Sequence, residues 1–168
     1  MNKKSLKSYG ARTDKSMKTV VRLEKTSLKI TNFTVNYLSK HNLTFNQFKV
    51  LEVLYHLGDL NIGSITKLTM STPGNITVVV KNLKRDGWIT SIKDPNDNRA
   101  SILSITQKGT EIIEHVFPTH AKNLNKALEV LSDEELNTLY DLLNKVYKAN
   151  WYFFALLLLI SIILYIQK

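Results

Sequence analysis

The sequence of 168 residues contains no cysteine, which excludes disulfides, cysteine–zinc sites and thiol-based redox sensing together. A chain without cysteine agrees with a cytoplasmic location. The N-terminal stretch stays polar past Arg22, and because no apolar h-region follows its first basic residues, we expect no signal peptide.

Acidic residues are scarce. Asp and Glu number 14 against 23 Lys and Arg, so the formal net charge is +9. A basic excess of this size favours a polyanionic partner, either nucleic acid or an anionic membrane surface, and does not choose between the two.

Catalytic motifs are also lacking. The sequence has no nucleophile elbow, glycine-rich phosphate loop or paired-carboxylate motif. His115 and His120 are candidate metal ligands together with Glu111 or Glu114. A spacing of five residues does not stack the two histidines on one helical face, however, and Pro118 lies between them. We therefore expect no enzyme activity, no metal site and no cofactor.

Between residues 13 and 149, the spacing of apolar residues predicts helices interrupted by one β-hairpin. Residues 13–40 contain neither proline nor glycine and predict a long first helix. Thr44 and Gln47 have the spacing of a capping box and open a second helix. Asn61 is placed to cap a short third helix.

A fourth helix begins around Pro73, which loses no needed backbone donor in a first turn, and Gly87 closes it. Two short β-runs come next, at 88–93 and 102–105, on either side of a dense turn signal at 94–99. The predicted inner stripe of the fourth helix is Ile76, Val79, Val80 and Leu83.

Two more helices follow the hairpin. Thr106 caps the fifth helix, Pro118 is its expected kink, and Ser132 and Glu135 have capping-box spacing at the start of the last helix. Three helices followed by a hairpin are the winged helix-turn-helix arrangement, in which the hairpin is the wing. The predicted fold class is mainly α with a small β-hairpin.

In such a unit the helix at about 72–85 is the DNA-recognition helix. Asn75 and Thr77 can pair with base edges, and Val78 can touch a thymine methyl group. The hydroxyl groups before the helix and the cations further along it are suited to phosphates, although a single lysine is more often simply solvated. The predicted DNA contacts on this element are Ser71, Thr72, Gly74, Asn75, Thr77, Val78, Lys81, Lys84 and Arg85.

The predicted wing tip adds two residues to this contact set. Arg99 on a tight turn can enter the minor groove, where the negative potential is strongest when the groove is narrow. Asp97 is placed to orient the guanidinium of Arg99.

The motifs in this order resemble the MarR family of bacterial regulators. Residues 43–51 resemble the second helix of the family, and residues 71–83 with 86–89 resemble its recognition helix and first wing strand. Residues 94–99 with 103–109 resemble its wing signature and the helix start after it. The resemblance covers nearly all of residues 43–148, and the motifs are specific only in combination.

One residue departs from the family pattern. The family often has two arginines after the wing aspartate, and here Asn98 takes the first place while Arg99 keeps the second. The resemblance implies a homodimer formed by the N- and C-terminal helices, and a pseudo-palindromic operator with half-sites about one DNA turn apart. It also implies a repressor relieved by a small, often aromatic, ligand. Residues 112–118 resemble the cysteine-free branch that responds to phenols or quinones.

The C-terminal tail, 150–168, lies outside this resemblance. From 151 to 166 every residue except Ser161 is apolar or aromatic, about 16 residues or ~24 Å as a helix, against a bilayer core of about 30 Å. An extended dimer helix is the alternative, but a dimer seam covers one face only and this run is apolar all round. The candidate membrane segment carries Trp151, Phe153, Phe154, Leu158, Ile162 and Tyr165.

The sequence therefore predicts three parts and two classes of function. The parts are a basic flexible arm at 1–12, a winged helix-turn-helix body at 13–149 and the apolar tail. The first function is a cytoplasmic, homodimeric repressor that binds double-stranded DNA and responds to a small aromatic effector. The second is a membrane-anchored interaction or signalling protein on the same scaffold. Lys145 and Lys148 precede the tail and would keep the body on the cytoplasmic side.

Overall fold

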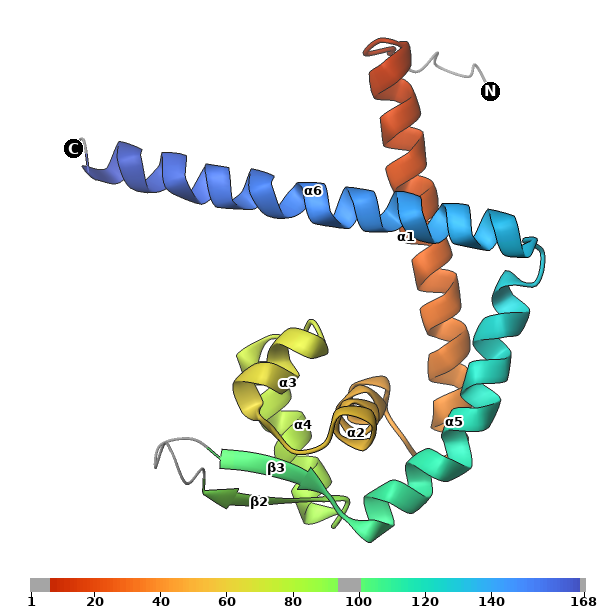
Figure 1. Ribbon diagram of the computed structural model, residues 1–168, viewed down its shortest axis with the longest axis vertical. Coiled ribbons are helices and arrows are strands. Elements are labelled where there is room, and N and C mark those ends of the chain that lie inside the picture. Colours follow the sequence, from red (N-terminus) through yellow and green to blue (C-terminus); the bar gives the residue numbers. More distant parts are fainter. Residues whose placement is uncertain (1–6, 94–100, 167–168) are drawn as a thin grey trace, which may run out of the picture. The chain divides into compact units, whose positions relative to one another are not determined.

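The computed structural model describes the backbone of residues 7–93 and 101–166, with side chains as far as residue 149. The chain divides into two compact units, Met1–Leu124 and Asn125–Lys168. The predicted fold class is confirmed: the first unit gathers short helices beside a small antiparallel sheet in the winged helix-turn-helix order (Figure 1).

The first helix, α1 (Ala11–Ser39), begins two residues earlier than expected. The carboxylate of Asp14 accepts hydrogen bonds from the Ser8 hydroxyl at 2.6 Å and from the Tyr9 N–H at 2.9 Å. These contacts tie the preceding residues to the first helical turn, so the end of the predicted flexible arm is helical. Only near its C-terminal end does α1 bury side chains, at Thr34 and Leu38.

Three short helices follow: α2 (Phe45–Leu57), α3 (Ile62–Leu68) and α4 (Pro73–Arg85). The predicted capping box is confirmed, because the Thr44 hydroxyl accepts from the Gln47 N–H while the Gln47 side chain accepts from the Thr44 N–H. Asn61 caps α3 as predicted, accepting from the Ser64 N–H at 2.8 Å.

The ends of α1, α3 and α4 share one hydrogen-bonding pattern, the Schellman motif, in which a residue shortly after the helix adopts a left-handed conformation. That residue is Asn42 (φ 55°), Met70 (φ 51°) and Gly87 (φ 75°) in turn. In the second case the Ser71 N–H donates to the Thr66 carbonyl at 3.1 Å. Met70 is therefore a non-glycine residue held in a conformation that costs most side chains about 1–2 kcal/mol.

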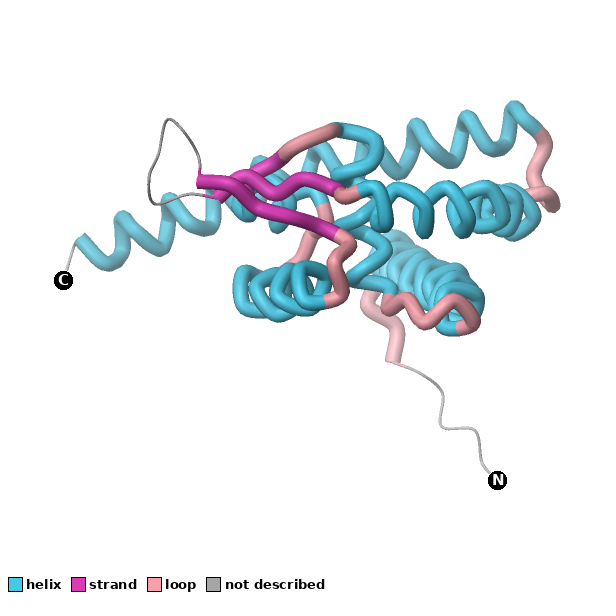
Figure 2. The backbone as a smooth tube through the Cα atoms, turned by 90° about the horizontal axis from the view of Figure 1, so that it is seen from below, coloured by secondary structure: helices cyan, strands magenta, loops and turns pink. Residues whose placement is uncertain are grey.

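The sheet has three strands, β1 (Leu60–Asn61), β2 (Ile89–Lys93) and β3 (Ser101–Ile105), in the order β1-β3-β2 (Figure 2). All pairs are antiparallel, with Leu60 opposite Leu103 and Ile89 opposite Ile105. The hairpin was predicted and β1 was not, because a strand of two residues is too short to produce an alternating pattern.

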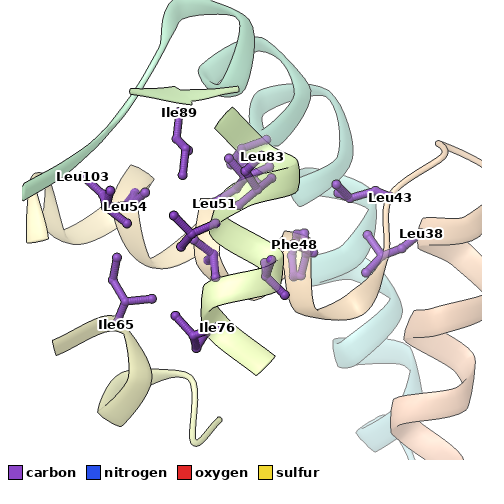
Figure 3. Close-up of a cluster of buried hydrophobic side chains, with 14 of the residues drawn as sticks. Leu38, Leu43, Phe48, Leu51, Leu54, Ile65, Ile76, Leu83, Ile89 and Leu103 are labelled. Atoms are coloured by element: carbon purple, nitrogen blue, oxygen red, sulfur yellow. The ribbon is translucent and has the colours of Figure 1, made fainter. Parts of the chain in front are cut away.

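The core lies where α2, α3, α4 and the sheet meet. Figure 3 shows Phe48, Leu51 and Leu54 of α2 facing side chains from the other elements. All four residues of the predicted inner stripe of α4 are buried, which confirms that part of the sequence interpretation. The other buried residues that close the core are Leu38, Leu43, Val50, Ile65, Ile89, Leu103, Ile113 and Val116.

The fifth helix, α5 (Gln107–Leu128), contains Pro118 and bends along its length (Figure 1). Its predicted cap is confirmed, since the Gly109 N–H donates to the Thr106 hydroxyl at 3.1 Å. The capping box of the last helix is also confirmed. The Glu135 N–H donates to the Ser132 hydroxyl at 3.3 Å, and the Ser132 N–H donates to the Glu135 carboxylate at 2.9 Å.

The last helix, α6, spans Asp133–Ile166 without a break, so the backbone of the tail continues the helix that starts in the body. Among the described residues, no helix is long and apolar enough to span a membrane. The candidate membrane segment, 151–166, lies outside the residues whose side chains the structure describes, and its insertion stays a prediction.

Candidate functional site

The helix α4 presents two chemically different faces. Its apolar stripe is buried, whereas the polar and cationic residues between the stripe positions are exposed, except for the half-buried Asn82. Ser71, which precedes the helix, is half-buried, and Val78 is 58% exposed. The exposed members of the predicted contact set are Thr72, Gly74, Asn75, Thr77, Val78, Lys81, Lys84 and Arg85. The side chains of this face therefore take no part in packing the core.

Local hydrogen bonds decide what each side chain of this face can offer. The Thr72 hydroxyl caps α4 by accepting from the Asn75 N–H at 3.4 Å. The Thr77 hydroxyl donates to the Pro73 carbonyl at 2.9 Å, so Thr77 presents a methyl group and an acceptor outward. No described residue hydrogen-bonds the Asn75 carboxamide. Asn75 is therefore the side chain of this face best suited to a bidentate contact.

The cations of α4 are not equivalent. Arg85 forms an ion pair with Asp86, with Nε 2.9 Å from Oδ1, and this hydrogen bond raises the pKa of the guanidinium. Part of its charge is thus neutralised locally. Lys81 and Lys84 have no ion pair with any residue that the structure describes. The sequence interpretation missed the pairing, although the adjacent opposite charges were a visible signal for it.

The wing is described only as far as its strands. The pair between Lys93 and Ser101 is the outermost one of β2 and β3. Asp97 and Arg99 fall within 94–100, outside the described residues. Their placement at a minor groove stays a prediction.

A closely packed junction joins the end of α4, the start of the wing and the start of α5. The Lys108 ammonium donates to the Asp86 carbonyl, and the Thr106 hydroxyl donates to the Gly87 carbonyl, both at 2.8 Å. The Thr106 N–H donates to the Trp88 carbonyl at 3.1 Å. The buried Gly109 lies directly against that same carbonyl. The sequence interpretation recognised the helix start here and missed this connection.

A cavity of about 360 Å³, open to solvent, lies between α1 and the middle of α5. Tyr37 is fixed on its wall, because its hydroxyl donates to the Val116 carbonyl at 3.1 Å. Lys40 is the charged side chain among the lining residues, and no carboxylate is among them. The complete lining is Phe33, Asn36, Tyr37, Lys40, Thr119 and Asn123. The lining therefore combines two aromatic rings with one cation and polar groups, and Phe33 and Lys40 are exposed.

All four histidines make edge-to-face contacts. His41 and His115 contact each other, and His41, His56 and His120 contact tyrosine or phenylalanine rings. His120 of α5 lies 4.8 Å from the ring of Phe48 and 6.2 Å from that of Phe117, centre to centre. It is 7% exposed, and its Nδ1 atom has no hydrogen-bond partner among the described residues. No group of three or more residues in the described part of the chain could hold a metal ion.

The contribution of His120 to the stability of the chain should be lost as the pH falls below about 6.5. Burial lowers the pKa of His120 below its ordinary value of 6.5, so the unfolded chain binds the proton more readily. This contribution is present above 6.5 and is lost as the pH falls toward the folded pKa. Burial raises the pKa of Glu52, which acts in the opposite direction. Urea midpoints measured against pH should fall less for His120→Leu; equal pH dependence of both proteins would contradict this assignment.

The chain is similar to known proteins both in sequence and in fold. A family model described as MarR family matches residues 43–101. The HTH-type transcriptional regulator MhqR of Bacillus subtilis is 32% identical over 134 residues, which cover 80% of this chain and 92% of MhqR.

Two solved structures have the same fold. A mutant of MarR from E. coli in complex with operator DNA has a TM-score of 0.73 at 24% identity, covering 79% of this chain and 96% of that one. BpsR of Bordetella bronchiseptica, whose DNA binding is regulated by 6-hydroxynicotinic acid, has a TM-score of 0.71 at 21% identity, covering 77% and 98%.

Proposed function

Because the chain belongs to the MarR family of transcriptional regulators, we propose that it represses transcription as a cytoplasmic homodimer on a pseudo-palindromic operator. The observation that carries the proposal is the exposed face of α4, which combines hydrogen-bonding and cationic side chains directly outside a buried stripe. A helix of this kind fits the major groove of B-DNA.

The roles follow from the position of each residue along the helix. Asn75 is placed to read an adenine edge, and the exposed methyl groups of Thr77 and Val78 to touch a thymine methyl group. Lys81 and Lys84, further along, neutralise phosphates. Gly74 allows close approach of the DNA backbone, and the N-terminus of α4 after Ser71 and Thr72 binds a phosphate. Arg85 contributes less than the two lysines because Asp86 shares its charge.

The homodimer is supported by apolar surface that each unit leaves open. In the first unit, α1 exposes Met17, Val20, Val21, Leu23 and Leu28; in the second, α6 exposes Leu139, Leu142, Leu143 and Val146. Exposed apolar surface on this scale marks an interaction site. Light scattering of the full chain should give twice the monomer mass, and a monomer at micromolar concentration would count against the proposal.

Selection of bound fragments from random DNA by the full chain tests the function directly. We expect enrichment of one two-fold symmetric sequence, bound in the nanomolar range with a marked loss of affinity as salt rises. Retention of fragments without any common sequence would refute sequence-specific regulation and leave the interaction protein as the remaining candidate.

Asn75→Ala should change sequence preference more than Lys84→Ala does. Loss of a bidentate contact removes discrimination at one base pair, worth about 1–3 kcal/mol, whereas loss of a phosphate contact weakens binding to all sequences alike. Binding is measured by fluorescence anisotropy on the selected duplex and on duplexes changed at single positions. A uniform loss on all duplexes for Asn75→Ala would argue against base reading by this residue.

Arg99→Ala should weaken binding to the selected duplex by about 1–3 kcal/mol. The reason is loss of a cation from the narrow minor groove, so the effect should be larger on duplexes with A·T pairs at the flanks. Anisotropy titrations on duplexes that differ only in those flanks measure it. Lys93→Ala, on the strand before the wing tip, is the control, and equal effects of the two changes would refute the wing assignment.

We also propose that the cavity between α1 and α5 holds a small aromatic effector. Its support is the pairing of aromatic walls with Lys40 and the absence of a carboxylate among the lining residues. Salicylate and simple phenols are suitable first probes. A probe that releases the selected duplex from the unaltered chain and not from Lys40→Met would support the site, and equal release from both would move the effector elsewhere.

Attachment to the membrane through 151–166 is proposed on the composition of that segment alone, with aromatic residues at both ends of an apolar run. Fractionation of the full chain against a chain ending at residue 150 tests it. The full chain should appear with the membranes and the shortened one in the soluble fraction, and equal solubility would exclude the anchor.

A further inference from the structure

A lysine outside the proposed DNA contacts holds the turn in front of α4. The ammonium of Lys49, on α2, donates to the carbonyl of Thr69 at 2.8 Å. Thr69 is the C-cap of α3, and the carbonyls at a helix C-terminus carry partial negative charge that attracts a cation. Lys108 makes the corresponding contact at the other end of α4, but from an exposed position.

The surroundings of Lys49 keep its ammonium at this carbonyl. The side chain is half-buried, and its Nζ lies 5.3 Å from the centre of the Phe45 ring. Burial lowers the pKa of Lys49. A charge withdrawn from water needs a hydrogen-bond acceptor, and the Thr69 carbonyl supplies one. The bond therefore ties α2 to the turn as well as satisfying the lysine.

The other contacts of the turn do not involve α2. Met70 is 86% exposed and in a left-handed conformation, Thr69 is buried, and the Ser71 hydroxyl donates to the same Thr69 carbonyl at 3.4 Å. The Thr69 hydroxyl and the Ser71 N–H both bond back into α3, which fixes the turn to α3 and not to α2. Because α4 begins at Pro73, the position of its N-terminal end depends on this turn, whereas its buried stripe fixes the rest of the helix in the core.

We infer that Lys49 is a positioning residue for DNA reading, which places the N-terminal end of α4 by holding the Thr69 carbonyl and does not contact DNA. The inference rests on the proposed function, because the position of this end matters for DNA binding only if α4 reads bases. Two other roles make different predictions. A phosphate contact would serve every DNA sequence equally, and a purely structural contact would affect stability alone.

The experiment compares three variants of the full chain on two duplexes, the one selected by the unaltered chain and a scrambled version of it. Lys49→Met keeps the aliphatic stem and removes the donor, and Lys49→Arg keeps a cationic donor. Lys84→Met is the matched comparison, an exposed lysine proposed to contact phosphate. Affinities are measured from about 50 to 200 mM salt, and urea midpoints are measured on the same preparations.

For Lys49→Met we expect about tenfold weaker binding to the selected duplex, with binding to the scrambled duplex and the salt slope unchanged. Lys49→Arg should recover most of the loss, because the guanidinium can reach the same carbonyl. Lys84→Met should weaken both duplexes and reduce the salt slope by about 0.9 for each phosphate that this lysine neutralises.

Two results for Lys49→Met would overturn the inference. A reduced salt slope with equal losses on both duplexes would make Lys49 a phosphate contact, and a lower urea midpoint with unchanged affinity would make its role structural. If the unaltered chain itself fails to distinguish the duplexes, the proposed function fails and the inference falls with it. If the unaltered chain distinguishes them and Lys49→Met does so equally well, only the inference fails.

Discussion

Gly109→Ala should destabilise the chain by about 3 kcal/mol or more and abolish binding to the selected duplex at micromolar protein. A Cβ atom at this position would overlap the carbonyl oxygen of Trp88 and lie 2.7 Å from Cγ1 of Ile105. The Trp88 carbonyl oxygen is a backbone atom and already accepts a hydrogen bond from the Thr106 N–H. Relief of the overlap would therefore separate α5 from the start of the wing.

Urea unfolding followed by circular dichroism measures the stability of Gly109→Ala, and anisotropy on the selected duplex measures its binding. Gly74→Ala is the control for stability, because a Cβ there meets no atom within 4 Å and alanine favours a helix by up to about 1 kcal/mol over glycine. We expect opposite shifts of the two midpoints. A midpoint for Gly109→Ala equal to that of the unaltered chain would show that the junction can open without cost.

Leu51→Ala should cost about 2–5 kcal/mol of folding free energy. Leu51 is fully buried at the centre of α2 and belongs to the cluster that also contains the inner stripe of α4 (Figure 3). Removal of its side chain leaves a cavity that the surrounding elements fill only in part. Since small domains are stable by about 5–15 kcal/mol in total, the population of folded, DNA-binding chain should fall at 37 °C.

Two matched variants separate burial from the chemical change. Leu51→Met nearly conserves volume and should cost less than about 1.5 kcal/mol. Leu57→Ala makes the same truncation near the end of α2 at a side chain that is 58% exposed, where about 0.5 kcal/mol is typical. Equal midpoints for the two alanine variants in a thermal or urea melt would contradict the described core.

The sequence predicted those features that depend on neighbours within one or two helical turns. The capping boxes at Thr44 and Ser132 join residues three positions apart. The inner stripe of α4 follows from the helical period alone. The exposed face that carries Asn75 is the complement of that stripe, so it follows from the same period.

Features that depend on distant residues could not be predicted in this way. Lys49 and Thr69 are 20 positions apart, and Lys108 and Asp86 are 22 apart. Neither pair belongs to a periodic pattern, and a lysine on a helix is most often solvated. The strand β1 exists only because β3 lies beside it. These contacts are consequences of the folded topology, which local spacing does not specify.

The helix α5 connects the junction at Gly109 with the cavity. This helix carries Thr119 and Asn123, which line the cavity, and also Lys108, whose ammonium contacts the Asp86 carbonyl at the end of α4. The backbone hydrogen bonds of a helix resist stretching, and a single residue, Thr106, separates α5 from β3. Because Pro118 lies between these residues and cannot donate the backbone hydrogen bond to residue 114, α5 can flex at this point. A displacement of α5 at the cavity would therefore reach the end of α4 and the base of the wing only in part.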